Sequence, residues 1–151
     1  MNRIDFRAED VPLPSWTKEA ESFIHKVLEN LEKKNWDLSV LFCSNKYMKS
    51  INSQFRNMDE ATDVLAFPLG EKNRAGRFIA GDIAVSLDAL EENSKLFKVS
   101  TDEELRRLLI HGILHLSGED HKGNRAEEPM LKTQEEILTR INATVIGGES
   151  A

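Results

Sequence analysis

The chain has 151 residues, of which 40% are hydrophobic and 30% charged, a balance typical of a globular protein with one core. We therefore predict a single domain over residues 1–151. The net charge of −6 disfavours a protein that coats nucleic acid through a positive field over its whole surface, although it leaves room for a local basic groove. The lone Cys43, expected to be a buried and inert thiol, excludes an internal disulfide. The sequence shows neither a signal peptide nor an apolar run near the ~18 residues of a membrane span, so we expect a cytoplasmic protein with no membrane partner.

Strand and helix patterns alternate in the first half of the chain. A short alternating strand over residues 4–6 is followed by two prolines, which forbid regular structure. Apolar residues spaced three and four apart then predict an amphipathic helix over residues 17–33, and a β-rich apolar run predicts a strand over residues 38–43. Ser44 or Asn45 is positioned to cap a second helix.

The second half of the chain predicts two more strands and three more helices. In order, they are strands over residues 64–67 and 78–85, a helix over residues 87–97, a helix capped by the box Thr101–Glu104, and a last helix from about Met130 to Ile141. Pro68 is expected to close the first of these strands, and Gly81 marks a bulge or a close backbone approach in the second. The predicted fold class is α+β: a small mixed sheet of about four strands packed with about five helices, with a central buried helix that carries an HxxxH motif.

Three of the four histidines fall in the short segment from His111 to His121. On a helix, His111 and His115 lie one turn apart on the same face, so both imidazoles can reach one ion. Gly118 suits a left-handed C-terminal cap, which would bring His121 towards the same point. Three protein ligands with one position left for water are typical of catalytic zinc. We therefore predict one Zn²⁺ per chain at these histidines, with Ni²⁺ or another transition ion able to substitute. The alternative, ordinary helix and loop histidines, does not explain the third histidine behind a correctly placed glycine.

The spacing HxxxHxxGxxH also matches a zinc-protease signature at each ligand and at the glycine. Those proteases need a glutamate as general base after the first histidine, where this chain has Gly112. Because glycine has no proton acceptor, the sequence disfavours peptide hydrolysis by that route while it retains the metal geometry.

Two motifs, Thr62–Pro68 and His111–His121, with Gly81–Ile83 between them, resemble the YbeY-type endoribonuclease family. The resemblance covers nearly the whole chain. It implies a bacterial, zinc-dependent single-strand endoribonuclease that acts in ribosomal RNA processing, at the 3′ end of 16S rRNA, and in ribosome quality control. The partners that it implies are RNA and the ribosome or ribosomal proteins.

Carried over residue by residue, the resemblance makes His111, His115 and His121 the metal ligands and Arg56 a functional arginine. The chain departs from the family pattern at Ala66, where serine is common, and at Glu119, where an aromatic residue is common. In phosphodiester hydrolysis the zinc would activate water while Arg56 neutralises charge on the phosphate. Without the resemblance, the simpler interpretation of Arg56 is an exposed arginine at a helix end.

Four carboxylates are candidates for the general base by residue type alone: Asp63, Asp82, Glu119 and Asp120. Asp63 and Asp82 could equally be loop caps. A three-histidine site does not identify its substrate, so two other functions stay open. One is a metallohydrolase of another substrate, and the other is a ribosome-assembly factor whose metal is mainly structural.

A basic region precedes the histidine motif. We predict that its six basic residues line an RNA-binding groove beside the metal: Lys46, Lys49, Arg56, Lys72, Arg74 and Arg77. Against four acidic residues in the same region they give a net charge of +2, whereas the whole chain carries −6. This excess is small, so we expect weak binding of free RNA with a shallow salt dependence. The alternative is that these are solvated helix and loop charges.

Overall fold

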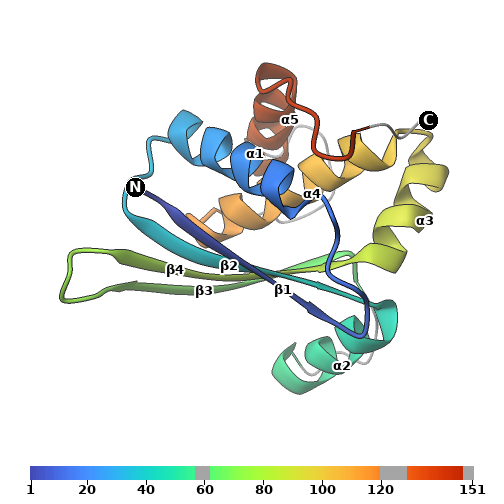
Figure 1. The fold of residues 1–151 in the computed structure, drawn as a ribbon, viewed down its shortest axis with the longest axis horizontal. Helices are drawn as coiled ribbons and strands as arrows, with labels where there is room; N and C mark the ends of the chain where they lie inside the picture. The colour runs from blue at the N-terminus through green and yellow to red at the C-terminus, as the bar shows by residue number, and fades with distance from the viewer. Residues whose placement is uncertain (57–61, 120–128, 148–151) are drawn as a thin grey trace.

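The computed structural model describes residues 1–56, 62–119 and 129–147 (Figure 1). These residues form β1 (Arg3–Glu9), α1 (Thr17–Asn30), β2 (Trp36–Cys43), α2 (Asn45–Arg56), β3 (Val64–Lys72), β4 (Phe78–Ser86), α3 (Leu87–Phe97), α4 (Thr101–Leu116) and α5 (Pro129–Arg140). The predicted α+β class is confirmed, with a four-stranded sheet and five helices in this part of the chain. None of these helices is long and apolar enough to cross a membrane.

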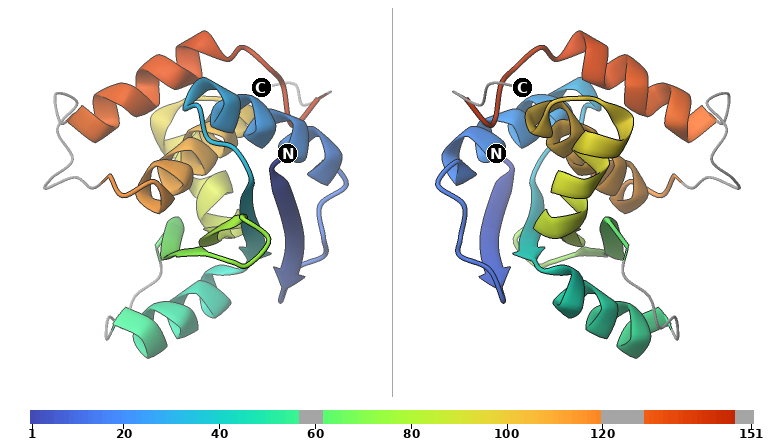
Figure 2. Two further views of the ribbon diagram at one scale, coloured as in Figure 1. Left: turned by 90° about the vertical axis from the view of Figure 1, so that its left-hand side faces the viewer. Right: turned by 90° about the vertical axis from the view of Figure 1, so that its right-hand side faces the viewer.

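The sheet is mixed and has the strand order β1-β2-β4-β3. Strands β1, β2 and β4 run parallel, and β3 pairs with β4 in the antiparallel direction. Helices α1 and α4 cover one face of the sheet, and α5 packs on α4 (Figures 1 and 2). Helix α2 lies on the opposite side of the sheet, below it in Figure 1. The two faces are therefore covered unequally.

Pro68 does not close the third strand, so that expectation is wrong. Strand β3 continues to Lys72, with Pro68 opposite Gly81 and a shift of register between Pro68 and Glu71. A proline is tolerated here because β3 lies at the edge of the sheet, where a missing N–H group leaves no partner strand unsatisfied. The expectation for Gly81 is confirmed, since a Cβ at its φ of +132° would overlap the carbonyl oxygen of Phe67.

The predicted capping box is wrong by one residue. Ser100 has an extended backbone, and its hydroxyl accepts a hydrogen bond from the Glu103 amide at 3.0 Å, so Ser100 is the N-cap of α4 and Thr101 is the first helical residue. Glu104, in the first turn of this helix, is buried and only 2% exposed.

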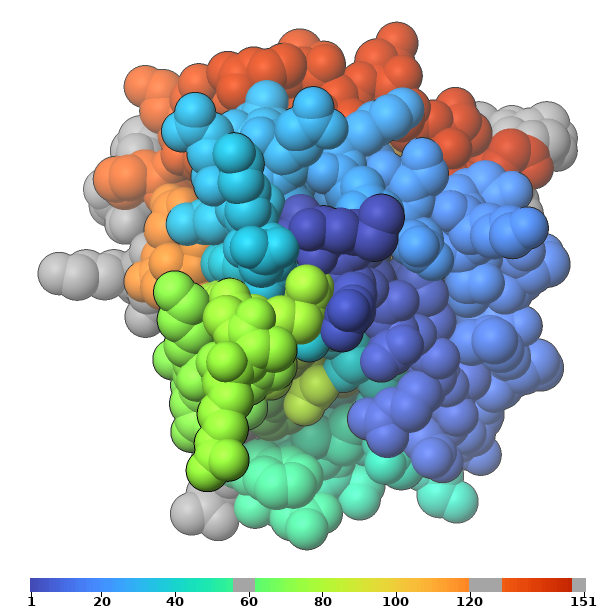
Figure 3. Space-filling model, turned by 60° about the vertical axis from the view of Figure 1, so that its left-hand side comes forward, coloured from blue at the N-terminus to red at the C-terminus, as the bar shows by residue number. Residues whose placement is uncertain are grey.

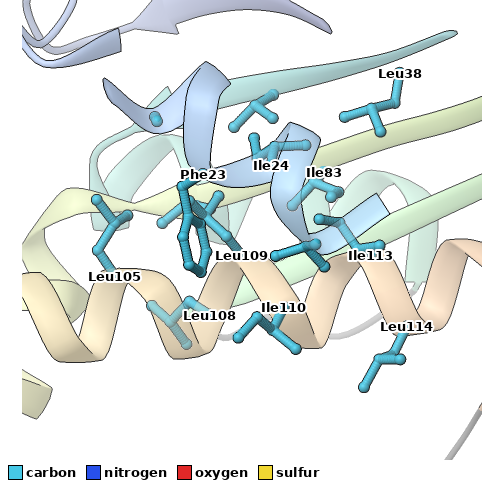
Figure 4. Close-up of a cluster of buried hydrophobic side chains, with 14 of the residues drawn as sticks. Phe23, Ile24, Leu38, Ile83, Leu105, Leu108, Leu109, Ile110, Ile113 and Leu114 are labelled. Atoms are coloured by element: carbon cyan, nitrogen blue, oxygen red, sulfur yellow. The ribbon is translucent and has the colours of Figure 1, made fainter. Parts of the chain in front are cut away.

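The core is built around α4, as expected from its apolar sequence. Leu105, Leu109 and Ile113 repeat every four residues and are fully buried, facing Phe23 of α1 and Ile83 of β4 among others (Figure 4). Each such side chain contributes about 1.5–3 kcal/mol on burial. The helix that carries the histidines is therefore held rigidly.

Cys43 is fully buried at the end of β2, with its Sγ 3.7 Å from the carbonyl oxygen of Val85. Burial, with smaller contributions from Asp88 and Asp10, raises the pKa of this thiol to about 12. The thiol stays protonated at neutral pH, which agrees with the expectation of an inert residue.

Gly112 allows α4 to approach the sheet closely, and this contact is testable. A Cβ at this position would lie 2.8 Å from Cγ2 of Ile83, which is fully buried and cannot move aside easily. We expect Gly112→Ala to lower the free energy of unfolding, because overpacking costs about 1–3 kcal/mol and exceeds the roughly 1 kcal/mol that alanine contributes to helix propensity. Urea denaturation followed by circular dichroism measures this loss.

The matched control is the same substitution in an Ile83→Ala background, where the colliding atoms are absent. There Gly112→Ala should cost nothing or should stabilise the protein. A Gly112→Ala protein that is as stable as wild type with Ile83 in place would show that this contact does not limit the approach of the helix.

Candidate metal centre

His111 and His115 lie in the last two turns of α4, and the structure brings them together as predicted. Their Nε2 atoms are 3.2 Å apart, and their ring centroids are separated by 4.8 Å. Two imidazole nitrogens bound to one tetrahedral zinc, each at about 2.0–2.1 Å, would be about 3.3 Å apart. The observed separation therefore fits two ligands of one zinc ion.

Gln134 of α5 orients the first histidine, and sequence analysis missed it. Its Oε1 is 2.6 Å from Nδ1 of His111, and its Nε2 donates to Glu135 at 3.0 Å. Because an amide oxygen only accepts, Nδ1 carries the proton and Nε2 of His111 is the nitrogen suited to a metal. Such a partner on the second ring nitrogen is usual for metal-bound histidines.

A signal for Gln134 does exist in the sequence. It occupies a buried position on α5 in one row with Met130, Ile137 and Leu138. A polar residue in an otherwise apolar stripe requires a hydrogen-bond partner. Sequence alone could not name that partner, because it lies on another helix.

The C-terminal end of α4 follows the prediction for Gly118. Its φ is +97°, its amide donates to the His115 carbonyl at 3.0 Å, and the Glu119 amide donates to the Leu114 carbonyl at 3.0 Å. These two bonds form a Schellman cap. The partial negative charge at this helix end favours a nearby cation. The third predicted ligand, His121, and Asp120 lie outside the described residues.

Gly112 points away from the histidine pair, towards the sheet. A side chain there would meet Ile83, as the Cβ position shows. Even a glutamate could not serve as a general base from this position without displacing the core. Packing against Ile83 thus explains why a glycine occupies this position. This is separate from the fact that glycine has no proton acceptor.

The described carboxylates differ in their suitability as a base. Asp82 bonds to Ser39, and with Arg7 it lines a hollow on the α2 side of the sheet, away from α4. Asp63 accepts from the Val64 amide at 2.8 Å and from Asn93 at 3.0 Å, as a loop cap would. Of the described candidates, only Glu119 follows the histidine helix directly.

The basic residues of the predicted groove lie on two elements. Lys46 and Lys49 line a shallow hollow on α2, whereas Lys72 and Arg74 belong to the β3–β4 hairpin, whose tip lies apart from α2 at the left of Figure 1. Arg77 donates to Asp37 at 2.7 Å and to the carbonyl of Met1 at 2.6 Å, so it anchors the start of β4. Arg56 is the last residue of α2, and its side chain lies outside the described part of the structure.

A second hollow of about 310 Å³ lies on the α2 side of the sheet. Figure 3 shows it between the β3–β4 hairpin, α2 and β1. Tyr47, Phe55 and Phe67 are among its lining residues, and the rings of Phe55 and Phe67 meet edge to face at 5.8 Å. Phe55 is 64% exposed and directly precedes Arg56, so an aromatic surface adjoins the end of α2.

The family model and the named relatives agree on one family. The model of the family described as endoribonuclease YbeY matches residues 3–142. Endoribonuclease YbeY of Treponema denticola is 51% identical over 122 residues, which cover 78% of this chain and 79% of that protein. The protein of the same name from Treponema pallidum is 40% identical over 144 residues, covering 93% and 90%. The solution structure of TM1509 from Thermotoga maritima superposes with a TM-score of 0.62 at 32% identity, covering 89% of this chain and 86% of that one.

Proposed function

The chain belongs to the endoribonuclease YbeY family, and on this premise we propose that it is a metal-dependent endoribonuclease that hydrolyses single-stranded RNA. The observation that best supports metal dependence is the pair of Nε2 atoms 3.2 Å apart, with His111 oriented by Gln134. The proposed ligands of one Zn²⁺ are His111, His115 and His121, and Ni²⁺ or another transition ion can substitute.

The chemistry supplied at such a site is activation of a water molecule for attack on a phosphodiester. Within the chain, His111 and His115 would hold the ion, and Gln134 would keep the His111 ring in one tautomer. Arg56 would bind the phosphate through its planar guanidinium and balance its developing charge. The exposed Phe55 beside it offers a surface on which an unpaired base can stack, which supports a preference for single strands.

Ribosomal RNA is the proposed substrate class, through the family resemblance. We propose a role in processing the 3′ end of 16S rRNA and in ribosome quality control, with the ribosome or ribosomal proteins as partners in the cytoplasm. The net charge of −6 supports a requirement for such partners, because this chain attracts free RNA poorly.

Metal content provides the first test. Purified protein loaded with zinc should hold about one ion per chain by elemental analysis, because three histidines form one tetrahedral site with an open position. His115→Ala should lose most of this zinc and RNA cleavage with it, while it remains folded by circular dichroism.

His25→Ala is the matched control, since His25 lies on α1 and pairs with Glu21 at 3.6 Å, far from the histidine motif in the sequence. It should retain zinc and activity. Retention of full zinc by His115→Ala would contradict the ligand set. Zinc-loaded wild type that binds RNA without cleaving it would favour an assembly factor over an enzyme.

Arg56 can be tested separately from the metal. Arg56→Ala should lower RNA cleavage at least about a hundredfold, the loss expected when one charge-stabilising donor is removed, and should leave zinc content unchanged. Arg56→Lys should restore only part of the activity, because lysine keeps the charge but lacks the planar fork. If Arg56→Ala cleaves RNA at the wild-type rate, the residue is an ordinary arginine at a helix end.

The basic groove is tested best at the hairpin. We expect the double substitution Lys72→Glu and Arg74→Glu to weaken RNA binding several-fold and to flatten its dependence on salt, because phosphate contacts are lost. Arg77 is left intact, since its ion pair with Asp37 holds the strand. Lys18→Glu with Lys26→Glu on the exposed surface of α1 gives the same charge change as a control. Equal affinity of the two double variants would mean that the hairpin charges are only solvated.

A further inference from the structure

Arg107 of α4 is the centre of a polar network. This network extends to His111 on one side and to Asp63 of the Thr62–Pro68 motif on the other. It lies one turn before His111, and its side chain is 23% exposed. Its guanidinium donates to Glu135 of α5 through Nε and Nη2 at 2.9 and 3.1 Å. It also donates to Glu104 and Glu103 at 3.0 Å each. The bidentate contact with Glu135 fixes that carboxylate in direction as well as in distance.

The first arm of the network runs from Arg107 to His111. Oε2 of Glu135 accepts from both Arg107 and the side-chain nitrogen of Gln134. Burial opposes ionisation of Glu135, but the hydrogen bonds from Arg107 and Gln134 lower its pKa, so it is a carboxylate at neutral pH. Because a carboxylate only accepts, the amide nitrogen of Gln134 faces Glu135 and the amide oxygen faces His111. The proton position on the His111 ring therefore depends on Glu135.

The second arm runs from Arg107 to the Thr62–Pro68 motif. Glu104 accepts from Arg107 and also from Nδ2 of Asn93 in α3, at 3.2 Å. The same nitrogen donates to Asp63 at 3.0 Å, and the carbonyl oxygen of Asp63 accepts from the Ser86 amide at 2.9 Å. One arginine thus connects the histidine helix with the segment that leads into β3.

A contribution to folding stability does not account for this network. Glu104 has a side chain only 3% exposed, and burial raises its pKa although Arg107 and Asn93 donate to it. Buried ion pairs contribute little to stability compared with apolar packing, and the half-exposed pair with Glu135 contributes little as well. Such an arrangement instead fixes the orientation of the side chains that are hydrogen-bonded to it.

We propose that Arg107 is a positioning residue that sets the tautomer of His111 through Glu135 and Gln134, and holds Asp63 through Glu104 and Asn93. The proposal rests on the proposed function, because it assigns Arg107 the task of keeping the metal-binding and motif segments of that one site in register. Arg107 acts through these residues and needs no contact with RNA or metal.

Each arm of the network can be disrupted by its own substitution. We expect Glu135→Ala to lower zinc affinity about tenfold, as loss of outer-shell partners does. In the metal-free protein it should also remove the single Nδ1–H tautomer of His111, read from nitrogen-15 NMR. Glu136→Ala, the next exposed carboxylate on α5, is the control and should match wild type in both measurements.

Asn93→Ala tests the second arm. It should leave zinc affinity unchanged and lower RNA cleavage about tenfold. Arg107→Lys should show both effects, because lysine cannot span the same acceptors.

The outcomes separate the proposal from the proposed function. A folded Glu135→Ala protein with wild-type zinc affinity and an unchanged His111 tautomer would overturn the first arm. Wild-type RNA cleavage by Asn93→Ala would overturn the second. The tautomer measurement needs neither zinc nor RNA, so failure of the wild type to bind zinc or to cleave RNA would count against the proposed function while the first arm is still decided.

Discussion

The contact between Gly112 of α4 and Ile83 of β4 determines where the other groups of the site lie. Glycine lets the helix backbone approach the sheet, and the apolar row of Leu105, Leu109 and Ile113 is buried on that side. Helical geometry then turns a second row, spaced every four residues, away from the sheet. That row is Glu103, Arg107, His111 and His115. Because α5 covers it, α5 supplies the groups that hold the histidine in place.

The basic residues divide into those that form internal ion pairs and those that are exposed. Several cations of this acidic chain are engaged in internal ion pairs, among them Arg77 with Asp37, Arg106 with Asp102 and Arg107 with three glutamates. A count of basic residues along the sequence therefore overestimates the charge available to RNA. Lys46 and Lys49 on α2 and Lys72 and Arg74 on the β3–β4 hairpin are exposed, so they remain the residues that we propose to meet phosphate.

Patterns that are local in the sequence predicted the fold and the approach of His111 to His115. Apolar spacing indicated the helices and strands, and the interval between His111 and His115 indicated their meeting, since both depend on helical repeat alone. Features set by distant parts of the chain could not be predicted. Pro68 fits inside β3 only because that strand is at the edge, which depends on β4 pairing between β2 and β3. Gln134 meets His111 only because α5 packs on α4 in one register.

The position of Gln134 on the last helix also bears on when the site forms during synthesis. Because α4 precedes α5 in the chain, His111 leaves the ribosome before Gln134, the residue that accepts a hydrogen bond from its Nδ1 atom. The hydrogen bonds that Asp102, in the first turn of α4, accepts from the amides of Val145 and Ile146 at 2.7 and 2.8 Å can form only later still, because these two residues follow α5. A chain that ends before α5 therefore has both histidines but lacks the residue that orients His111.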